Sequence, residues 1–198
     1  MMVPWKSRDA ASGGWTLPPH YVKTIGEEIL YEYAKLISRS AFGGKIVHPF
    51  VSDRFKALRD GRITMSGSIR EWLKERELPK ECVFCGTGEH LQADHLIPKS
   101  RGGGDTADNV VWACGGCNAS RGDQGVFQWL GLEEKDNLHR LVAGKYLKQL
   151  YELHALHGTL NVHKESVSEL CPRCRNGPAC IRWDTVRKLS CFCLESVF

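Results

Sequence analysis

The sequence has no apolar run of the roughly 20 residues that a membrane-spanning helix requires, so we expect no membrane role. The first residues, MMVPWKSRDAASGGW, also lack the apolar core of a secretory signal. There are nine cysteines, but eight of them come in close pairs that are typical of metal sites rather than of a secreted disulfide scaffold. We therefore expect a reducing, cytoplasmic location.

The chain also has little net charge, +4 over 198 residues. This excess is compatible with a polyanionic partner such as DNA, and equally with a protein that has a mixed surface. Most of it lies near the C-terminus, where residues 171–198 hold five basic and two acidic residues. The charge alone therefore does not identify a partner.

The N-terminal third of the chain predicts helices. Residues 1–17 are expected to be flexible, and residues 18–79 form a helical region. The spacing Thr24-x-x-Glu27 is typical of a capping box, and apolar residues then recur at helical spacing up to Gly43. In all, helices are predicted over 24–43, 52–60 and 68–77.

Two Cys-x-x-Cys pairs dominate the middle of the sequence. Cys82 and Cys85 form the first pair, and Cys114 and Cys117 form the second, with 28 residues between the pairs. Four thiolates in this arrangement can surround one tetrahedral Zn²⁺. Such a zinc ion would tie both ends of the segment together and replace a hydrophobic core.

The residues between the pairs predict a strand over 90–93, a glycine-rich bend and a second strand over 109–113. A helix is expected to begin near Asn118. The fold class is therefore α+β, with a small ββα core over residues 80–132 that is stabilised by zinc and surrounded by helices.

The motifs of this core, taken together, resemble those of a known family. The segment is similar to the HNH endonucleases, the ββα-metal nuclease superfamily. The resemblance is carried by the two cysteine pairs, Asp94-His95, Pro98, Ser100, Gly102, Gly103, Asn109 and Asn118-x-x-Arg121.

The resemblance implies a role for each of four polar residues. His95 would activate water, Asp94 and Asn118 would hold the catalytic metal, and Asn109 would brace the loop that carries the base. Asn118 stands where the name-giving pattern has histidine, which makes this an HNN-type variant. Oxygen ligands of this kind favour Mg²⁺ or Mn²⁺ over Ni²⁺ or Zn²⁺.

Three cations flank these residues, and they are expected to contact DNA phosphates: Lys99, Arg101 and Arg121. Each of them could equally be a solvated surface charge. His90 is not expected to be catalytic, because an odd separation in a strand places it on the face opposite His95.

The C-terminal part contains an amphipathic helix over residues 133–160 and a cysteine-rich, basic segment over residues 161–198. Cys171 and Cys174 form another Cys-x-x-Cys pair. A second zinc site would be completed by Cys191 and Cys193, or by Cys180 with one of these two. The alternative is a set of buried thiols without a metal.

Together these features predict a metal-dependent DNA endonuclease that hydrolyses phosphodiester bonds, with a restriction or other defence role. The alternatives are a phage or mobile-element nuclease of the same type, and a zinc-stabilised module that binds nucleic acid or partners without cleaving. Because one site cuts one strand at a time, double-strand cleavage would call for a homodimer or a partner protein.

Overall fold

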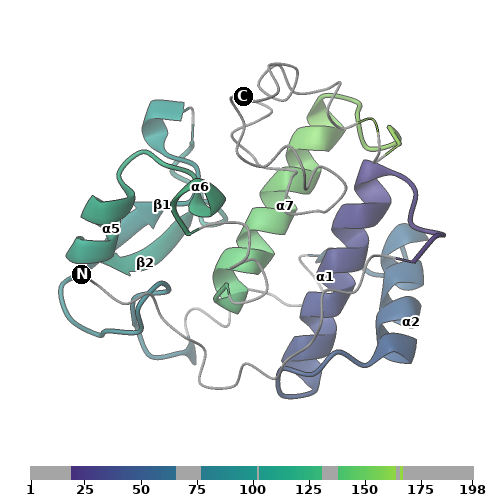
Figure 1. The fold of residues 1–198 in the computed structure, drawn as a ribbon, viewed down its shortest axis with the longest axis horizontal. Coiled ribbons are helices and arrows are strands. Elements are labelled where there is room, and N and C mark those ends of the chain that lie inside the picture. The colour runs from purple at the N-terminus through teal and green to yellow at the C-terminus, as the bar shows by residue number, and fades with distance from the viewer. Residues whose placement is uncertain (1–18, 66–76, 102, 131–137, 164–165, 167–198) are drawn as a thin grey trace.

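The computed structural model describes residues 19–65, 77–101, 103–130, 138–163 and 166. In these residues the fold is α+β, with a helical part and a smaller part built on a two-stranded antiparallel sheet (Figure 1). The elements in chain order are α1 (Ile25–Ala41), α2 (His48–Arg59), β1 (Leu91–His95), the 3-10 turn η1 (Lys99–Arg101), β2 (Val110–Cys114), α5 (Gly115–Arg121), α6 (Val126–Leu130) and α7 (Arg140–Leu156).

Helix α1 begins as its sequence predicts. The Thr24 side chain accepts a hydrogen bond from the backbone N–H of Glu27, and the Glu27 carboxylate accepts one from the N–H of Thr24. This confirms the capping box, which satisfies amide groups that the helix itself leaves unpaired. The helix then lies between α2 and α7, and its apolar residues form the centre of the larger hydrophobic core.

Helix α2 begins at His48, four residues before the predicted start at Ser52. Pro49 lies in the first turn, where its fixed φ suits a helix and its missing N–H costs no hydrogen bond, so the helix extends to it. The helix predicted over 68–77 lies outside the described residues except for Glu77.

The sheet pairs His95 with Val110 and Asp94 with Val111. The first strand begins at Leu91 rather than at His90, because His90 has a left-handed backbone with φ of 50°. The second strand runs one residue further than predicted, to Cys114. The hairpin is therefore present with its ends shifted by one or two residues.

Helix α5 begins at Gly115, and the expected start near Asn118 was too late. Cys114 caps the helix, since its Sγ accepts a hydrogen bond from the N–H of Cys117 at 3.4 Å. The second cysteine pair thus lies at the junction of β2 and α5, where a metal ion would bind.

Helix α7 joins the two parts of the molecule. Val142 packs in the smaller core beside Val111 and Phe84, whereas Leu150 and other residues further along α7 pack in the larger core with α1. The helix begins at Arg140; residues 131–137 before it lie outside the described residues.

The second zinc site that the sequence predicts also lies outside the described residues, because residues 167–198 are not among them. Within the described part of the chain, no helix is both long and apolar enough to cross a membrane.

Candidate active site

Four cysteines meet at the base of the hairpin. The sulfur atoms of Cys82, Cys85, Cys114 and Cys117 all lie within 4.8 Å of one another, and Cys85 Sγ is 3.6 Å from Cys114 Sγ. A tetrahedral zinc site with Zn–S bonds of about 2.3 Å has S–S distances of about 3.8 Å. The geometry therefore fits Zn²⁺, as the spacing predicts.

The thiols of this cluster differ in acidity. The hydrogen bond from the Cys117 N–H to Cys114 Sγ lowers the pKa of Cys114 to about 7. Burial raises the pKa of Cys117 and Cys85 instead, because it disfavours a thiolate without a counter-charge. Four thiolates in this space require a cation, which couples metal binding to deprotonation and to folding.

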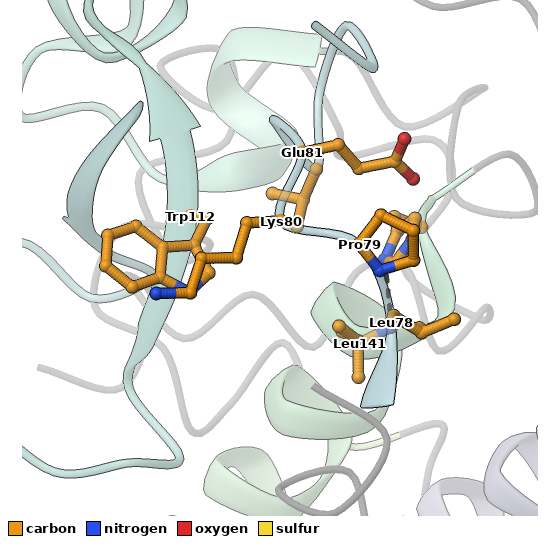
Figure 2. Close-up of a pocket in the computed structure, with 8 residues that line it drawn as sticks. Leu78, Pro79, Lys80, Glu81, Trp112 and Leu141 are labelled. Carbon is orange, nitrogen blue, oxygen red and sulfur yellow. Dashed lines mark hydrogen bonds between the residues drawn. The ribbon is translucent and has the colours of Figure 1, made fainter. Parts of the chain in front are cut away.

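A shallow pocket lies beside the hairpin, between the segment that leads into the first cysteine pair and the start of α7. Figure 2 shows its lining: Leu78, Pro79, Lys80, Glu81, Trp112, Leu141 and neighbouring residues. The Lys80 ammonium lies 4.7 Å from the centre of the Trp112 ring, close enough for a cation–π contact. The lining is mostly apolar and contains none of the predicted catalytic residues.

Asp94 and Arg121 form a buried ion pair at the other end of the hairpin. Asp94 Oδ1 accepts a hydrogen bond from the Arg121 guanidinium, and both side chains are almost fully buried. Asp94 Oδ2 is also buried, and within the described part of the chain no hydrogen-bond donor reaches it. A buried carboxylate oxygen without a donor is rare, and a cation ligand would account for it.

Arg121 was expected to contact phosphate at the surface, but it lies in the interior with 2% of its surface exposed. Its guanidinium also donates to the backbone carbonyls of His95 at 2.5 Å, Leu96 at 3.3 Å and Gln124 at 3.0 Å. Arg121 therefore connects α5 to the end of β1 and is not available at the surface for phosphate contact.

His95 is the more accessible member of the Asp94-His95 pair, with 19% of its side chain exposed. Its Nε2 lies 2.6 Å from Asp105 Oδ1, and Asp105 Oδ2 lies 2.8 Å from the Lys99 ammonium. Lys99 and His95 together lower the pKa of Asp105, with Lys99 contributing more. Asp105 was missed in the sequence; the signal was a carboxylate directly after the glycine-rich bend.

Asn109 closes the loop that follows His95. Its side-chain oxygen accepts a hydrogen bond from the Ile97 N–H at 2.8 Å, and its amide donates to the carbonyls of Ile97 at 3.1 Å and Gly104 at 2.9 Å. The residue is 1% exposed. These contacts join both arms of the loop, in the position that a bracing residue requires.

Asn118 lies on α5 three residues before Arg121, a spacing at which two side chains are neighbours on a helix surface. Asn118 is half-buried, and no hydrogen bond of its side chain is found in the described parts of the chain. Lys99 is 60% exposed and paired with Asp105. The side chain of Arg101 is not among the described features, and Gly102 lies outside the described residues.

The segment is a ββα unit in which four cysteines lie close enough to bind one zinc ion. A histidine follows a buried carboxylate at the end of its first strand. Residues 82–125 match the family model of the HNH endonucleases. This match to one segment of the chain confirms the resemblance seen in the sequence. Searches of curated proteins and of solved structures found no match.

Proposed function

We propose that the protein is a metal-dependent DNA endonuclease that hydrolyses phosphodiester bonds, with His95 as the general base. The single observation that carries this proposal is the partly exposed His95 next to the buried Asp94, whose Oδ2 has no hydrogen-bond donor in the described residues, inside a segment that matches a nuclease family. Histidine is the side chain that most often serves as general base in catalysis near neutral pH.

In this proposal His95 acts on the attacking water. His95 takes a proton from a water molecule, whose oxygen bonds to phosphorus as the P–O bond to the departing sugar oxygen breaks. The leaving oxygen gains a proton from solvent. His95 is accessible enough to meet a phosphate, because part of its ring is exposed at the end of β1.

Asp94 and Asn118 are the residues that would hold Mg²⁺ or Mn²⁺. Asp94 Oδ2 fits this role, since it is buried and the described residues offer it no hydrogen bond. Arg121 occupies Oδ1, so we expect Asp94 to bind a cation through one oxygen only. When bound, the ion supplies charge stabilisation for the phosphoryl and leaving oxygens.

Zn²⁺ at the four cysteines has a structural role in this proposal, because all four sulfur ligands come from the protein and no position remains for water. The alternative function is a zinc-stabilised module that binds nucleic acid without cutting. A structural zinc site requires neither His95 nor the unpaired oxygen of Asp94, and this favours the nuclease.

We further propose a restriction or other defence role, with a phage or mobile-element nuclease as the second candidate. Target choice would come from residues outside the HNH segment or from a partner protein, because phosphate contacts position a nuclease without reading sequence. Double-strand cleavage would require two active sites, as in a homodimer.

The test is cleavage of supercoiled plasmid by zinc-loaded protein with Mg²⁺, Mn²⁺ or EDTA. We expect cleavage with Mg²⁺ or Mn²⁺. We expect none after a short treatment with excess EDTA. His95→Ala should lower the rate by about 10²–10⁴ while zinc content and helical signal stay unchanged.

The matched control is His90→Asn. His90 is exposed and has a left-handed backbone, which asparagine tolerates better than alanine does. His90→Asn should cut like the wild type. Full activity of a folded His95→Ala preparation would overturn the proposal.

A further inference from the structure

The carboxylate of Asp105 is bound on both of its oxygens. Oδ1 lies 2.6 Å from His95 Nε2, and Oδ2 lies 2.8 Å from the Lys99 ammonium. Asp105 is ten residues from His95 in sequence and comes from the glycine-rich bend, whereas Lys99 lies in η1. The end of β1, η1 and the glycine-rich bend therefore meet at one carboxylate.

The bend that carries Asp105 is fixed by its neighbours. A side chain at Gly103 would place its Cβ 1.9 Å from the carbonyl oxygen of Ile97, so the backbone approaches there as closely as only glycine allows. Asn109 holds the carbonyl of Gly104, the residue directly before Asp105. The position of Asp105 is therefore set by backbone contacts, although its side chain is 68% exposed.

This arrangement has a chemical consequence for His95. A carboxylate that accepts the Nε2–H proton leaves Nδ1 unprotonated, and it also holds the ring in one orientation. The same logic applies to any histidine base whose second nitrogen is held by a carboxylate. In the described residues, no hydrogen bond to His95 Nδ1 is found, and 19% of the His95 side chain is exposed.

We propose that Asp105 is the positioning residue of His95, held in place by Lys99. This inference rests on the proposed function and names the residue that prepares its base. Asp105 touches neither phosphate nor metal in this role; it acts through His95. Lys99 then has two roles, since its ammonium can hold Asp105 and still present donors to a phosphate.

A different reading of the same contacts is that the Asp105 carboxylate occupies the place of a DNA phosphate between two cations and must leave before cleavage. The two readings predict opposite effects. Loss of a positioning group slows the reaction, whereas loss of a competing anion speeds it and tightens DNA binding.

The experiment compares full-length, zinc-loaded wild type with Asp105→Ala, Asp105→Glu and Asp123→Ala. Asp123 is an exposed carboxylate of the same domain, so its removal controls for a lost negative charge near DNA. We expect Asp105→Ala to lower kcat by about 10- to 100-fold with KM changed less than threefold, as for the loss of a residue that orients a catalytic group. Asp105→Glu should recover part of kcat, and Asp123→Ala should match the wild type.

A second measurement does not depend on activity. In protein with nitrogen-labelled imidazoles, the His95 Nε2–H bonded to Asp105 should give a downfield proton signal, assigned by its loss in His95→Ala. The signal should vanish in Asp105→Ala and persist in Asp123→Ala.

The outcomes separate this inference from the proposed function. If the wild type does not cut but the proton signal behaves as described, the nuclease proposal fails and the contact stands without a catalytic use. If the wild type cuts and Asp105→Ala cuts equally well or faster, or if Asp123→Ala loses as much, Asp105 is not a positioning residue.

Discussion

Arg121 and Asp94 form an ion pair in the interior of the HNH segment, and this pair joins the last turn of α5 to the end of β1. Asp94 is thereby held by the protein on one oxygen and left open on the other. The pair makes the geometry of the expected metal ligand depend on a residue that lies 27 positions further along the chain.

The first prediction concerns this pair. Arg121→Ala would leave the Asp94 carboxylate buried without this counter-charge and would remove a donor from three carbonyl groups, so we expect a loss of about 3–5 kcal/mol in the free energy of unfolding. Arg121→Lys should lose less, because an ammonium keeps the charge but cannot reach all partners. Urea denaturation of zinc-loaded protein measures both.

The control for that prediction is the double variant Asp94→Asn with Arg121→Leu. It removes both charges, so it should be more stable than Arg121→Leu alone, and together with the single variants Arg121→Leu and Asp94→Asn it completes a double-mutant cycle that gives the coupling. Stability of Arg121→Ala within 1 kcal/mol of the wild type would contradict the structural role.

The second prediction concerns zinc. Protein purified without added metal should contain one zinc per chain from the central cysteines, and two if the cysteines between Cys171 and Cys193 form a further site. Cys117→Ser should lose the central ion and unfold this part of the chain, because metal binding and folding are coupled. Elemental analysis and circular dichroism give both values. A zinc content near zero would remove the argument for a structural metal.

The third prediction concerns the bend beside the active site. Gly103→Ala would bring a Cβ to 1.9 Å from the Ile97 carbonyl oxygen and 2.8 Å from the Asn109 amide nitrogen, so backbone must shift. We expect a loss of about 1–3 kcal/mol and a lower cleavage rate, since the same bend carries Asp105. Gly104→Ala is the matched control, because among the described residues its Cβ would meet the Thr106 methyl group alone, at an ordinary 3.7 Å. Equal effects of the two variants would show that the close approach at Gly103 does not matter.

Local signals in the sequence predicted local structure well. The Thr24/Glu27 capping box depends on residues three positions apart, and it forms as predicted. The cysteine spacing likewise identified the four sulfur atoms that converge. Boundaries were less accurate: α5 starts three residues before Asn118, because the Cys114 sulfur caps the helix, a role that the sequence pattern does not reveal.

Long-range contacts could not be predicted in this way. Whether Arg121 faces solvent or Asp94 depends on how α5 packs against β1, and a basic residue in the last turn of a helix is compatible with both. Asp105 was missed for a similar reason: only the folded bend brings its carboxylate to His95. Sequence motifs therefore predicted the kind of site, whereas tertiary packing determines which further residues contact it.

The last prediction concerns pH and the helical part of the molecule. His154 lies near the end of α7 with 1% of its surface exposed, and its Nδ1 is 2.8 Å from the Thr159 hydroxyl. Burial, with a smaller contribution from the charge of His157, lowers the pKa of His154 from 6.5 to about 4. The folded protein therefore keeps this ring neutral in a range where the unfolded chain binds a proton.

The sign of the effect follows from that difference. Above pH 6.5 the ring is neutral in both states and contributes no pH dependence. Between pH 6.5 and about 4, the unfolded state binds a proton that the folded state does not. Stability therefore falls as the pH falls through this range. We expect this one group to account for a loss on the order of 1–2 kcal/mol between pH 7 and pH 5. The cysteine cluster also responds to acid, but it does so equally in the wild type and in His154→Gln. The measurement is therefore the unfolding free energy of both proteins at pH 7 and at pH 5, and the difference between their two declines. His154→Gln should show a shallower decline, while His157→Gln, at an exposed position, should change the slope only slightly, because burial is the larger cause of the lowered pKa of His154. Parallel curves for the wild type and His154→Gln would show that this ring is not held neutral by the fold.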